Sequence, residues 1–410
     1  MNHSAYTRTF KNRISQRGLS LVELMISITI GLLILSALAT LFVNQSKTRI
    51  ELDKSNRLID NGRYALEVLS ENLRLAGFYG ERELVATKAI NDPCTTTPTD
   101  PSVTEMRDAL GLHVAGYDAN GVVATIASPP CGLTSAELKP GSDILVLRRA
   151  DTTSTPEAPI YEVSIPAVSA VSGKHYIQLS NCKYDTATSV IGKTASEFNL
   201  RQRDCTSTST LPAANVRHFF VQAYFISPNN IAGDGIPTLK VIELDPAYTG
   251  ASTIHKCVDG STPSPATSNC FIITPLVEGI EYLQVDYGID GDNNADGLMD
   301  DLNGDGVVSD GDKDGAADRY IQTCDIVPHT QLEIAECWSN TVSVRLNVIA
   351  RNTEPTAGYT NTNTYTLGQV GTFGPFANVV IGGIDKGGYK RHVFTQTVRL
   401  INPSGRRERP

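Results

Sequence analysis

Aspartate side chains crowd one short stretch of the sequence. Residues 290–318 contain ten aspartates and one lysine, and the pattern D-x-[N/D]-x-D-G occurs there three times at an interval of nine residues. Its oxygen-bearing positions are Asp292, Asn294 and Asp296, then Asp301, Asn303 and Asp305, then Asp310, Asp312 and Asp314. Oxygens at alternate positions of such a loop can converge on one hard cation, and the glycine that follows permits a sharp turn. The pattern therefore predicts a structural Ca²⁺-binding loop over residues 290–318.

The three copies do not make complete EF-hand loops. At the position where an EF-hand carries a bidentate glutamate, the successive copies hold Asn303, Asp312 and Ile321. The nine-residue period instead resembles thrombospondin-type-3 calcium repeats, in which neighbouring loops share ions. We expect roughly one to three ions of weak, extracellular-type affinity, with Kd on the order of 10⁻⁴–10⁻³ M. The alternative is a solvated acidic loop that binds no ion, because its carboxylates repel one another.

A single acid interrupts the apolar run near the N-terminus. Residues 1–18 carry four basic residues and no acid, and residues 19–43 carry one charge, Glu23. A helix of this length spans a bilayer, and the basic flank places its N-terminal side in the cytoplasm. A carboxylate in hydrocarbon costs about 2.5–3.5 kcal/mol, so Glu23 is expected to have a functional partner. A cut after Gly18 would place a new amine on Leu19, about one helical turn from Glu23. The alternative is a plain single-pass anchor.

The segment Gly18-Leu19-Ser20-Leu21-Val22-Glu23-Leu24 resembles the type IV prepilin cleavage motif. The first residue after the family's cleavage site is usually phenylalanine, and here it is Leu19. The resemblance implies that residues 1–18 are a leader peptide. It implies that a prepilin peptidase cuts between Gly18 and Leu19 and N-methylates Leu19. It also implies that Glu23 neutralises the Leu19 amine of a neighbouring subunit during assembly.

Eight cysteines are scattered through the rest of the chain. They are Cys94, Cys131, Cys182, Cys205, Cys257, Cys270, Cys324 and Cys337. The even number, the absence of C-x-x-C and the expected export favour disulfides over metal binding. Spacing alone leaves about 105 pairings open. We expect sequential pairs that close local loops: 94–131, 182–205, 257–270 and 324–337. The alternative is free buried thiols.

Hydrophobic periodicity predicts the elements that position these residues. Beyond the transmembrane segment 19–43, an amphipathic helix continues over 44–80 and ends near Gly77. Its expected apolar stripe is Leu52, Ile59, Leu66 and Leu73, with Gly62, Leu69 and Ala76 beside it. Strands are expected at 143–149, 217–226, 239–243, 341–350 and 392–400. The predicted class is α+β with a long N-terminal helix on an antiparallel head, with residues 81–215 as a β-rich insertion and 216–402 as the core.

Further motifs resemble one pilin family. They are Asn61–Glu67 with Arg74–Gly80, Leu276–Asp290, and Arg391–Leu400. They are similar to the PilW-type minor pilins, relatives of the J-type pseudopilin of type II secretion. The resemblance implies a type IV pilin fold and a role in pilus assembly, in a priming or tip complex with other minor and major pilins. It allows a tip adhesin as a further partner. It implies an inner-membrane protein with a cytoplasmic N-terminus and a periplasmic head, and an extracellular pilus location after assembly. Alternatives are a type II secretion pseudopilin and a calcium-dependent adhesive head on a pilus stalk.

Charge and motif content argue against two other classes. The net charge of −9 equals the charge of residues 290–318, so the remainder sums to zero and offers no general basic surface for nucleic acid. The sequence lacks H-E-x-x-H, G-x-S-x-G and P-loop patterns. The glycine-rich stretch 382–388 precedes a predicted strand, so it is interpreted as a turn. We therefore expect neither a nucleic-acid-binding protein nor an enzyme.

Overall fold

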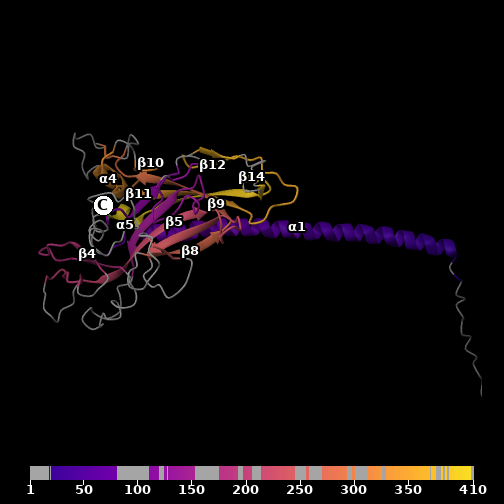
Figure 1. Cartoon of the computed structure of the whole chain (residues 1–410), viewed down its shortest axis with the longest axis horizontal. Coiled ribbons are helices and arrows are strands. Elements are labelled where there is room, and N and C mark those ends of the chain that lie inside the picture. The colour runs from indigo at the N-terminus through magenta and orange to yellow at the C-terminus, as the bar shows by residue number, and fades with distance from the viewer. Residues whose placement is uncertain are drawn as a thin grey trace, which may run out of the picture. The chain divides into compact units, whose positions relative to one another are not determined.

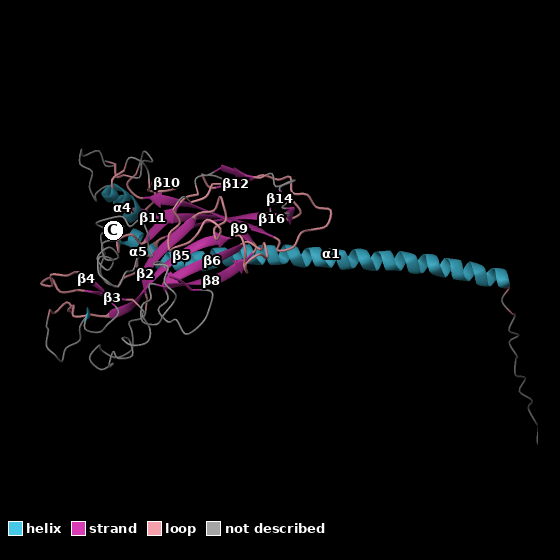
Figure 2. Cartoon of the chain, in the orientation of Figure 1, coloured by secondary structure: helices cyan, strands magenta, loops and turns pink. Residues whose placement is uncertain are grey.

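The computed structural model describes most of the chain, with gaps. The described residues are 18, 20–80, 110–119, 124–126, 128–152, 175–192, 197–205, 214–244, 255–257, 270–292, 298–300, 313–325, 329–369, 371–374, 380–381, 384–385 and 387–407. The chain divides into two compact units, Met1–Asp53 and Lys54–Pro410. Figures 1 and 2 show the helices and strands.

One long helix begins the described chain. The helix α1 runs without a break from Leu21 to Leu75. It ends where the Ala76 N–H donates to the Leu73 carbonyl (3.1 Å) and Gly77 takes a φ of +72°, a conformation that favours glycine. The predicted helix, with its end near Gly77, is confirmed over the described residues, and Leu19 lies outside them.

The remaining elements are mostly strands. In chain order they are β1 (Val114–Tyr117), β2 (Ile144–Ala150), β3 (Tyr176–Leu179), β4 (Ser189–Gly192), β5 (Val216–Ser227), β6 (Thr238–Leu244), β7 (His255–Cys257), β8 (Cys270–Glu278), β9 (Ile280–Ile289), β10 (Arg319–Ile321), α4 (Gln331–Ser339), β11 (Thr341–Arg351), β12 (Tyr365–Leu367), β13 (Gly371–Phe373), β14 (Val380–Ile381), β15 (Ile384–Asp385), β16 (Arg391–Arg399) and α5 (Ile401–Arg407). The five predicted strands are confirmed as β2, β5, β6, β11 and β16. The α+β class is confirmed as well.

The described residues of the second unit form four antiparallel sheets: two of only two strands each, β12-β13 and β14-β15, and two larger ones. The larger has the order β1-β2-β5-β6-β8-β7, with β3 pairing with β4 and β5, and the smaller has the order β10-β9-β11-β16. Strands from residues 81–215 therefore share a sheet with strands that follow residue 215. The chain passes between the sheets at Gly279, between β8 and β9. Its φ is +78°, and a Cβ at this position would lie 2.7 Å from the Arg351 carbonyl oxygen, which explains why this turn needs glycine.

The part of α1 that begins at Lys54 packs on these sheets. Its residues Leu66, Leu69 and Leu73 share one core with strand residues of both sheets. The predicted stripe is confirmed there, but Ile59 is only half-buried and Leu58 is buried in its place. An α-helix drifts by about 20° per heptad, so a strict heptad row leaves the buried face. Leu52, which precedes this unit, is exposed.

The larger sheet is buried on both faces. Leu145 and Leu147 of β2 lie in the core shared with α1, and Ile144 and Val146 lie in a second core on the opposite face. Strands β2 and β5 are therefore buried along most of their length, as expected for strands covered on both sides.

Gly116 of β1 and Tyr287 of β9 lie very close to each other in the core. A Cβ on Gly116 of β1 would collide with the hydroxyl of Tyr287 on β9, which is fully buried and has no hydrogen-bond partner among the described residues. We expect Gly116→Ala to destabilise the protein by about 1–3 kcal/mol through overpacking. Tyr287→Phe should be close to neutral, because it removes an unpaired hydroxyl. Thermal unfolding of the double variant should recover only part of the loss, because the ring Cζ would still lie 2.6 Å from the new Cβ. Strictly additive effects would contradict this account.

Candidate processing and assembly site

The start of α1 is the candidate processing and assembly site. Ser20 caps the helix, since its Oγ accepts the Glu23 N–H (3.2 Å) and its carbonyl accepts the Leu24 N–H (3.1 Å). The spacing Ser20-x-x-Glu23 is that of a capping box, and an acid in the first turn also interacts favourably with the helix dipole. The first turn of α1 therefore holds the Glu23 backbone in a defined place.

The Glu23 side chain is exposed and available to a partner. Among the described residues it makes no hydrogen bond or ion pair. Gly18 is also exposed, and a Cβ placed on it would have no heavy atom within 4 Å. Leu19, the residue expected to carry the new amine, lies outside the described residues. The exposure of Gly18 is compatible with cleavage beside it. The unpaired Glu23 carboxylate is compatible with later pairing to an amine from another chain.

The apolar half of α1 suits a membrane. By length and composition the helix can cross one, and none of its most apolar window is buried within the protein. Three hydroxyls in this stretch are satisfied inside the helix: Ser27 donates to the Glu23 carbonyl (2.7 Å), Thr29 to the Met25 carbonyl (3.0 Å) and Thr40 to the Ser36 carbonyl (2.9 Å). Such bonds lower the cost of placing these polar groups in lipid.

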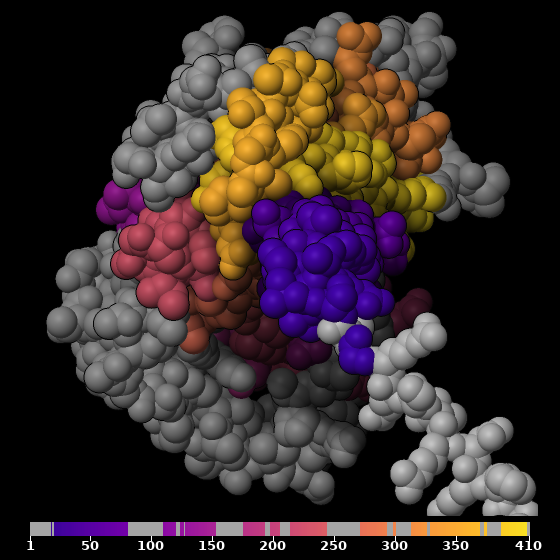
Figure 3. All heavy atoms as spheres, turned by 90° about the vertical axis from the view of Figure 1, so that its right-hand side faces the viewer, coloured from indigo at the N-terminus to yellow at the C-terminus, as the bar shows by residue number. Residues whose placement is uncertain are grey.

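Polar contacts fix the second half of α1 to the strands. The Lys54 ammonium donates to the Pro355 carbonyl (3.2 Å) and pairs with Glu354 (3.4 Å). Figure 3 shows atoms from the last part of the chain in orange and yellow. The Asn61 amide donates to the Glu278 carbonyl (2.9 Å). At Gly62 the ring of Phe394 on β16 occupies the space that a Cβ would need. The glycine thus lets the helix approach β16 closely.

The predicted calcium ligands fall mostly outside the described residues. Asp292 and Asp314 are described, whereas Asn294, Asp296, Asp301, Asn303, Asp305, Asp310 and Asp312 are not. Within the described ranges, no group of three or more His, Cys, Asp or Glu side chains forms a metal site. The calcium prediction therefore remains a prediction.

The two ends of the acidic segment meet at a buried carboxylate. Asp290 at the end of β9 accepts the N–H groups of Asp314 and Gly315 (both 3.1 Å) and pairs with Arg407 of α5 (3.2 Å). Burial raises the pKa of nearby Asp318, and the negative charges of Asp290 and other aspartates add to this rise. The acidic segment is thus closed at its base, and carboxylates repel one another there.

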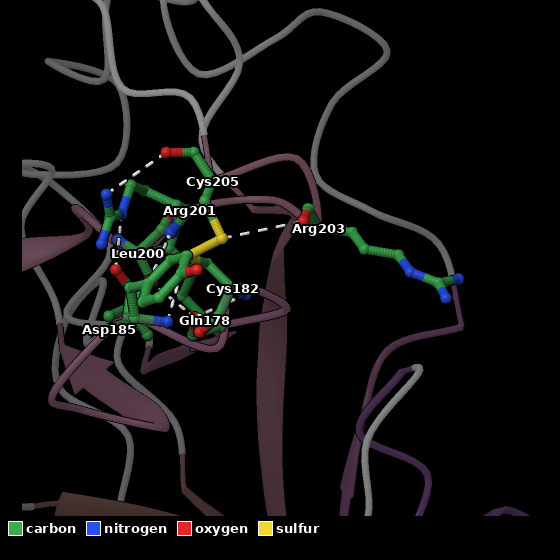
Figure 4. Close-up of polar contacts among 9 residues, drawn as sticks. Gln178, Cys182, Asp185, Leu200, Arg201, Arg203 and Cys205 are labelled. Carbon is green, nitrogen blue, oxygen red and sulfur yellow. Dashed lines mark hydrogen bonds and ion pairs between the residues drawn. A yellow bond between two sulfur atoms is a disulfide. The ribbon is translucent and has the colours of Figure 1, made fainter.

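Two disulfides are described. Cys182–Cys205 joins the region after β3 to residues before β5, and Cys324–Cys337 ties the chain after β10 to α4. Both pairs match the sequential pairing expected from the sequence. Figure 4 shows Arg201 beside Asp185 and next to the first disulfide; the Arg201 Nε lies 2.6 Å from Asp185 Oδ1.

The other four cysteines are described less completely. Cys131 is disulfide-bonded, and Cys257 lies opposite Cys270 in the pairing of β7 with β8. Opposed residues of an antiparallel pair are close enough for a disulfide. Cys94 lies outside the described residues, so the pairs 94–131 and 257–270 remain predictions.

Two buried charged clusters in the head were not predicted from the sequence. In the first, Asp143, directly before β2 of the larger sheet, binds to β9 of the smaller sheet. Its carboxylate accepts the N–H groups of Ala119 (3.1 Å) and Val285 (2.9 Å), and its own N–H donates to the Leu283 carbonyl (2.9 Å). Burial raises the pKa of Asp143 well above its usual value, and the neighbouring charge of Asp118 raises it further.

This raised pKa predicts a pH dependence of stability. A carboxyl whose pKa is higher in the fold stabilises the folded state fully below its unfolded pKa, about 3.9, and less as pH rises through the folded value. Thermal unfolding temperature should therefore fall as pH rises through that range. Asp286 and Tyr287 of β9 also face this cluster, and burial raises the pKa of each. Asp118→Asn removes the repulsion and should flatten the profile; an unchanged slope would contradict the role of the pair.

The second cluster surrounds Glu281 of β9. Its carboxylate binds Arg391 of β16 through Nε (2.5 Å) and Nη2 (3.0 Å), and Arg351 of β11 lies 3.7 Å away. All three side chains are buried. Burial alone would raise the pKa of Glu281, but the two guanidinium groups hold it below its usual value. The acid therefore stays ionised and supplies one negative charge between two buried cations, with its closer pairing to Arg391.

Comparison with known proteins agrees with these features. A family model described as Type IV Pilus-assembly protein W (PilW) matches residues 224–402, from within β5 to the start of α5. A model described as Prokaryotic N-terminal methylation motif matches residues 13–39, which include Gly18, Leu19 and Glu23. The two cover about half of the chain. No curated protein and no solved structure matches it. The chain belongs to the PilW family of type IV pilus-assembly proteins and carries its prepilin methylation motif.

Proposed function

We propose that this protein is a minor pilin that acts in the priming or tip complex of a type IV pilus. The observation that carries the proposal is the Gly18–Glu23 motif at the first turn of an uninterrupted 55-residue helix, with the Glu23 carboxylate unpaired among the residues described. The PilW match over the β-rich head supports it. Proteins of this family are structural rather than enzymatic.

The proposed sequence of events follows from the physics of α1. The chain is inserted in the inner membrane with its basic leader in the cytoplasm and its head in the periplasm. Prepilin peptidase removes residues 1–18 and methylates Leu19. The apolar half of α1 then leaves the lipid for a bundle of other minor and major pilins, where Glu23 pairs with the Leu19 amine of a neighbour. The head is carried to the outside with the pilus and offers a support for a tip adhesin.

Three measurements test this function. N-terminal mass spectrometry of the membrane-extracted protein should find a chain that begins at methylated Leu19. Gold labelling of the head on intact pili should mark filament ends, and deletion of the gene should reduce the number of pili per cell. Label spread along the filament shafts, or a normal pilus number without the protein, would reject the priming and tip role. A chain that begins at Met1 in assembled pili would reject the whole proposal.

We also propose that residues 290–318 bind Ca²⁺ and that the ion orders this segment. Three copies of the oxygen-rich pattern support the proposal, as does the closure of the segment's base by Asp290. Carboxylate oxygens are the ligands that Ca²⁺ prefers. The ion would neutralise aspartates that otherwise repel one another.

Calcium addition should therefore stabilise the protein. With Kd near 1 mM, 10 mM Ca²⁺ should add about 1.4 kcal/mol to the free energy of unfolding. A variant with Asp301, Asp305 and Asp310 changed to asparagine should lose this gain, whereas Asp60→Asn on the exposed face of α1 should keep it. Calorimetry that detects no calcium heat with the unmodified protein would reject the site and leave the pilin function unaffected.

A further inference from the structure

The buried cluster around Glu281 contains more cations than acids. Besides Arg351 and Arg391 it includes Lys139, which precedes β2 and whose ammonium lies 5.0 Å from the centre of the Tyr282 ring. Burial lowers the pKa of Lys139; the charge of Glu281 opposes this shift, and the charges of Arg351 and Arg391 add to it. Three cations therefore act on one another around a single carboxylate.

The carboxylate of Glu281 is occupied by one of these cations. Both of its oxygens accept hydrogen bonds from Arg391, one from Nε (2.5 Å) and the other from Nη2 (3.0 Å). The Nε of Arg351 lies 3.7 Å from the same carboxylate, which is too far for a hydrogen bond. Within the described part of the chain, the Lys139 ammonium makes no hydrogen bond or ion pair. Glu281 therefore leaves two of the three cations without a close counter-charge.

Arg351 carries buried donors that lack an acceptor. Its side chain is 1% exposed, and of its three nitrogens only Nη2 donates a hydrogen bond, to the Gly235 carbonyl (2.6 Å). The Nε and Nη1 atoms are buried and have no hydrogen-bond partner among the described residues. The Tyr389 ring covers one face of the guanidinium, whereas the N–H groups of a guanidinium point along its plane. Buried donors of this kind indicate a bound water or ion.

The acids of the adjoining loop and strand are engaged elsewhere. Asp234, in the loop before β6, is exposed, and its carboxylate accepts the N–H groups of Ile231 (2.8 Å) and Ile236 (2.9 Å) in that loop. Glu278 is also exposed and accepts a hydrogen bond from the Asn230 amide (2.6 Å). A buried guanidinium without a close counter-charge is strongly destabilising. An anion taken from the solvent would remove that penalty.

We propose that Arg351 binds a small monovalent anion from the solvent, such as chloride, through its Nε–H and Nη1–H groups. Lys139, which is half-exposed, adds positive charge to the site. The cost of desolvating an ion rises steeply with its charge, and Arg351 is almost wholly buried, so a monovalent ion is favoured over phosphate. Because Arg351 of the smaller sheet also holds Gly235 in the loop between β5 and β6 of the larger one, the ion stabilises the contact between the two sheets. The site does not depend on the proposed pilin function.

Urea denaturation of the full-length protein in detergent tests the site. Sodium chloride is compared with sodium gluconate at equal ionic strength, so that general screening is the same and only chloride is small enough to be buried. At a chloride concentration about ten times Kd, the equilibrium constant of unfolding should be about tenfold smaller than in gluconate. Broadening of the chloride NMR signal by the folded protein should report binding directly. Equal stability in the two salts would overturn the proposal and assign the Arg351 donors to water.

Three variants locate the ion. Arg351→Met removes the donors and should abolish both the chloride effect and the NMR broadening. Lys139→Gln changes a half-exposed position, so it serves if Arg351→Met does not fold, and it should raise Kd at least about tenfold. Arg345→Met is the matched control, because Arg345 lies on the same strand and also covers a tyrosine ring, that of Tyr320 (4.1 Å to its centre); it should keep the full effect. A full chloride effect in a folded Arg351→Met or Lys139→Gln variant, or an equal loss in Arg345→Met, would refute the site.

Discussion

Glu23→Ala is expected to reduce pilus number per cell at least about tenfold in a strain that depends on this protein. Placing the Glu23 carboxylate in lipid is unfavourable by about 2.5–3.5 kcal/mol. Pairing with the amine of a neighbouring subunit would offset this free energy, and that pairing is available only in the assembled bundle. The Glu23 side chain, unpaired within the described part of the single chain, fits this account. Removing the Glu23 carboxylate makes α1 more stable in the membrane. It also removes the favourable free energy that the carboxylate provides when α1 moves from the lipid into the pilin bundle. Counting pili by electron microscopy gives the measurement.

Matched variants isolate the cause. Glu23→Gln keeps the size and the helix start but removes the charge, so it should resemble alanine. Glu71→Ala changes an exposed acid of α1 outside the apolar run and should leave pilus number unchanged. Gly18→Ala should block cleavage, so its product should retain the leader in mass spectrometry. Normal piliation with Glu23→Ala would remove the assembly mechanism even if the leader were cut normally.

Local sequence patterns predicted the elements that need only local information. The apolar run and Gly77 predicted α1, and β-branched clusters predicted five strands. The helix α4 was missed although Thr330 and Glu333 carry a capping box, which the structure contains. That signal was available in the sequence. It preceded only nine residues, too short for a clear helical period.

The buried charged clusters could not be predicted in the same way. Ser142 and Leu283 bond to each other across 141 residues of sequence, and this contact positions Asp143 beside β9. Likewise, Glu281 meets Arg391 only because β9 and β16 both flank β11. Nothing near these residues in sequence distinguishes them from exposed charges. Their roles follow from the order of strands, which local patterns do not specify.

The Glu281 cluster carries the largest expected effect on stability. Glu281→Gln leaves the guanidinium groups of Arg351 and Arg391 buried without a counter-charge, which should cost about 3–5 kcal/mol. Because the pKa of Glu281 is lowered in the fold, its contribution is present above the unfolded value, about 4.3, and is lost as pH falls through the folded value. Chemical denaturation of the full-length protein in detergent, followed at neutral pH, gives the measurement.

Two controls distinguish an uncompensated charge from a simple loss of packing. Glu278→Gln alters an exposed acid three residues away and should change the free energy of unfolding by no more than about 0.5 kcal/mol. Replacing Glu281 and Arg391 together with methionine removes one buried charge of each sign and should recover part of the loss, since apolar side chains of similar size often substitute for a buried pair. The remaining cation, Arg351, still donates to the Gly235 carbonyl (2.6 Å) and lies 3.9 Å from the centre of the Tyr389 ring, so it keeps partial compensation. If the double variant is less stable than Glu281→Gln, packing dominates at this site, and the electrostatic explanation is wrong.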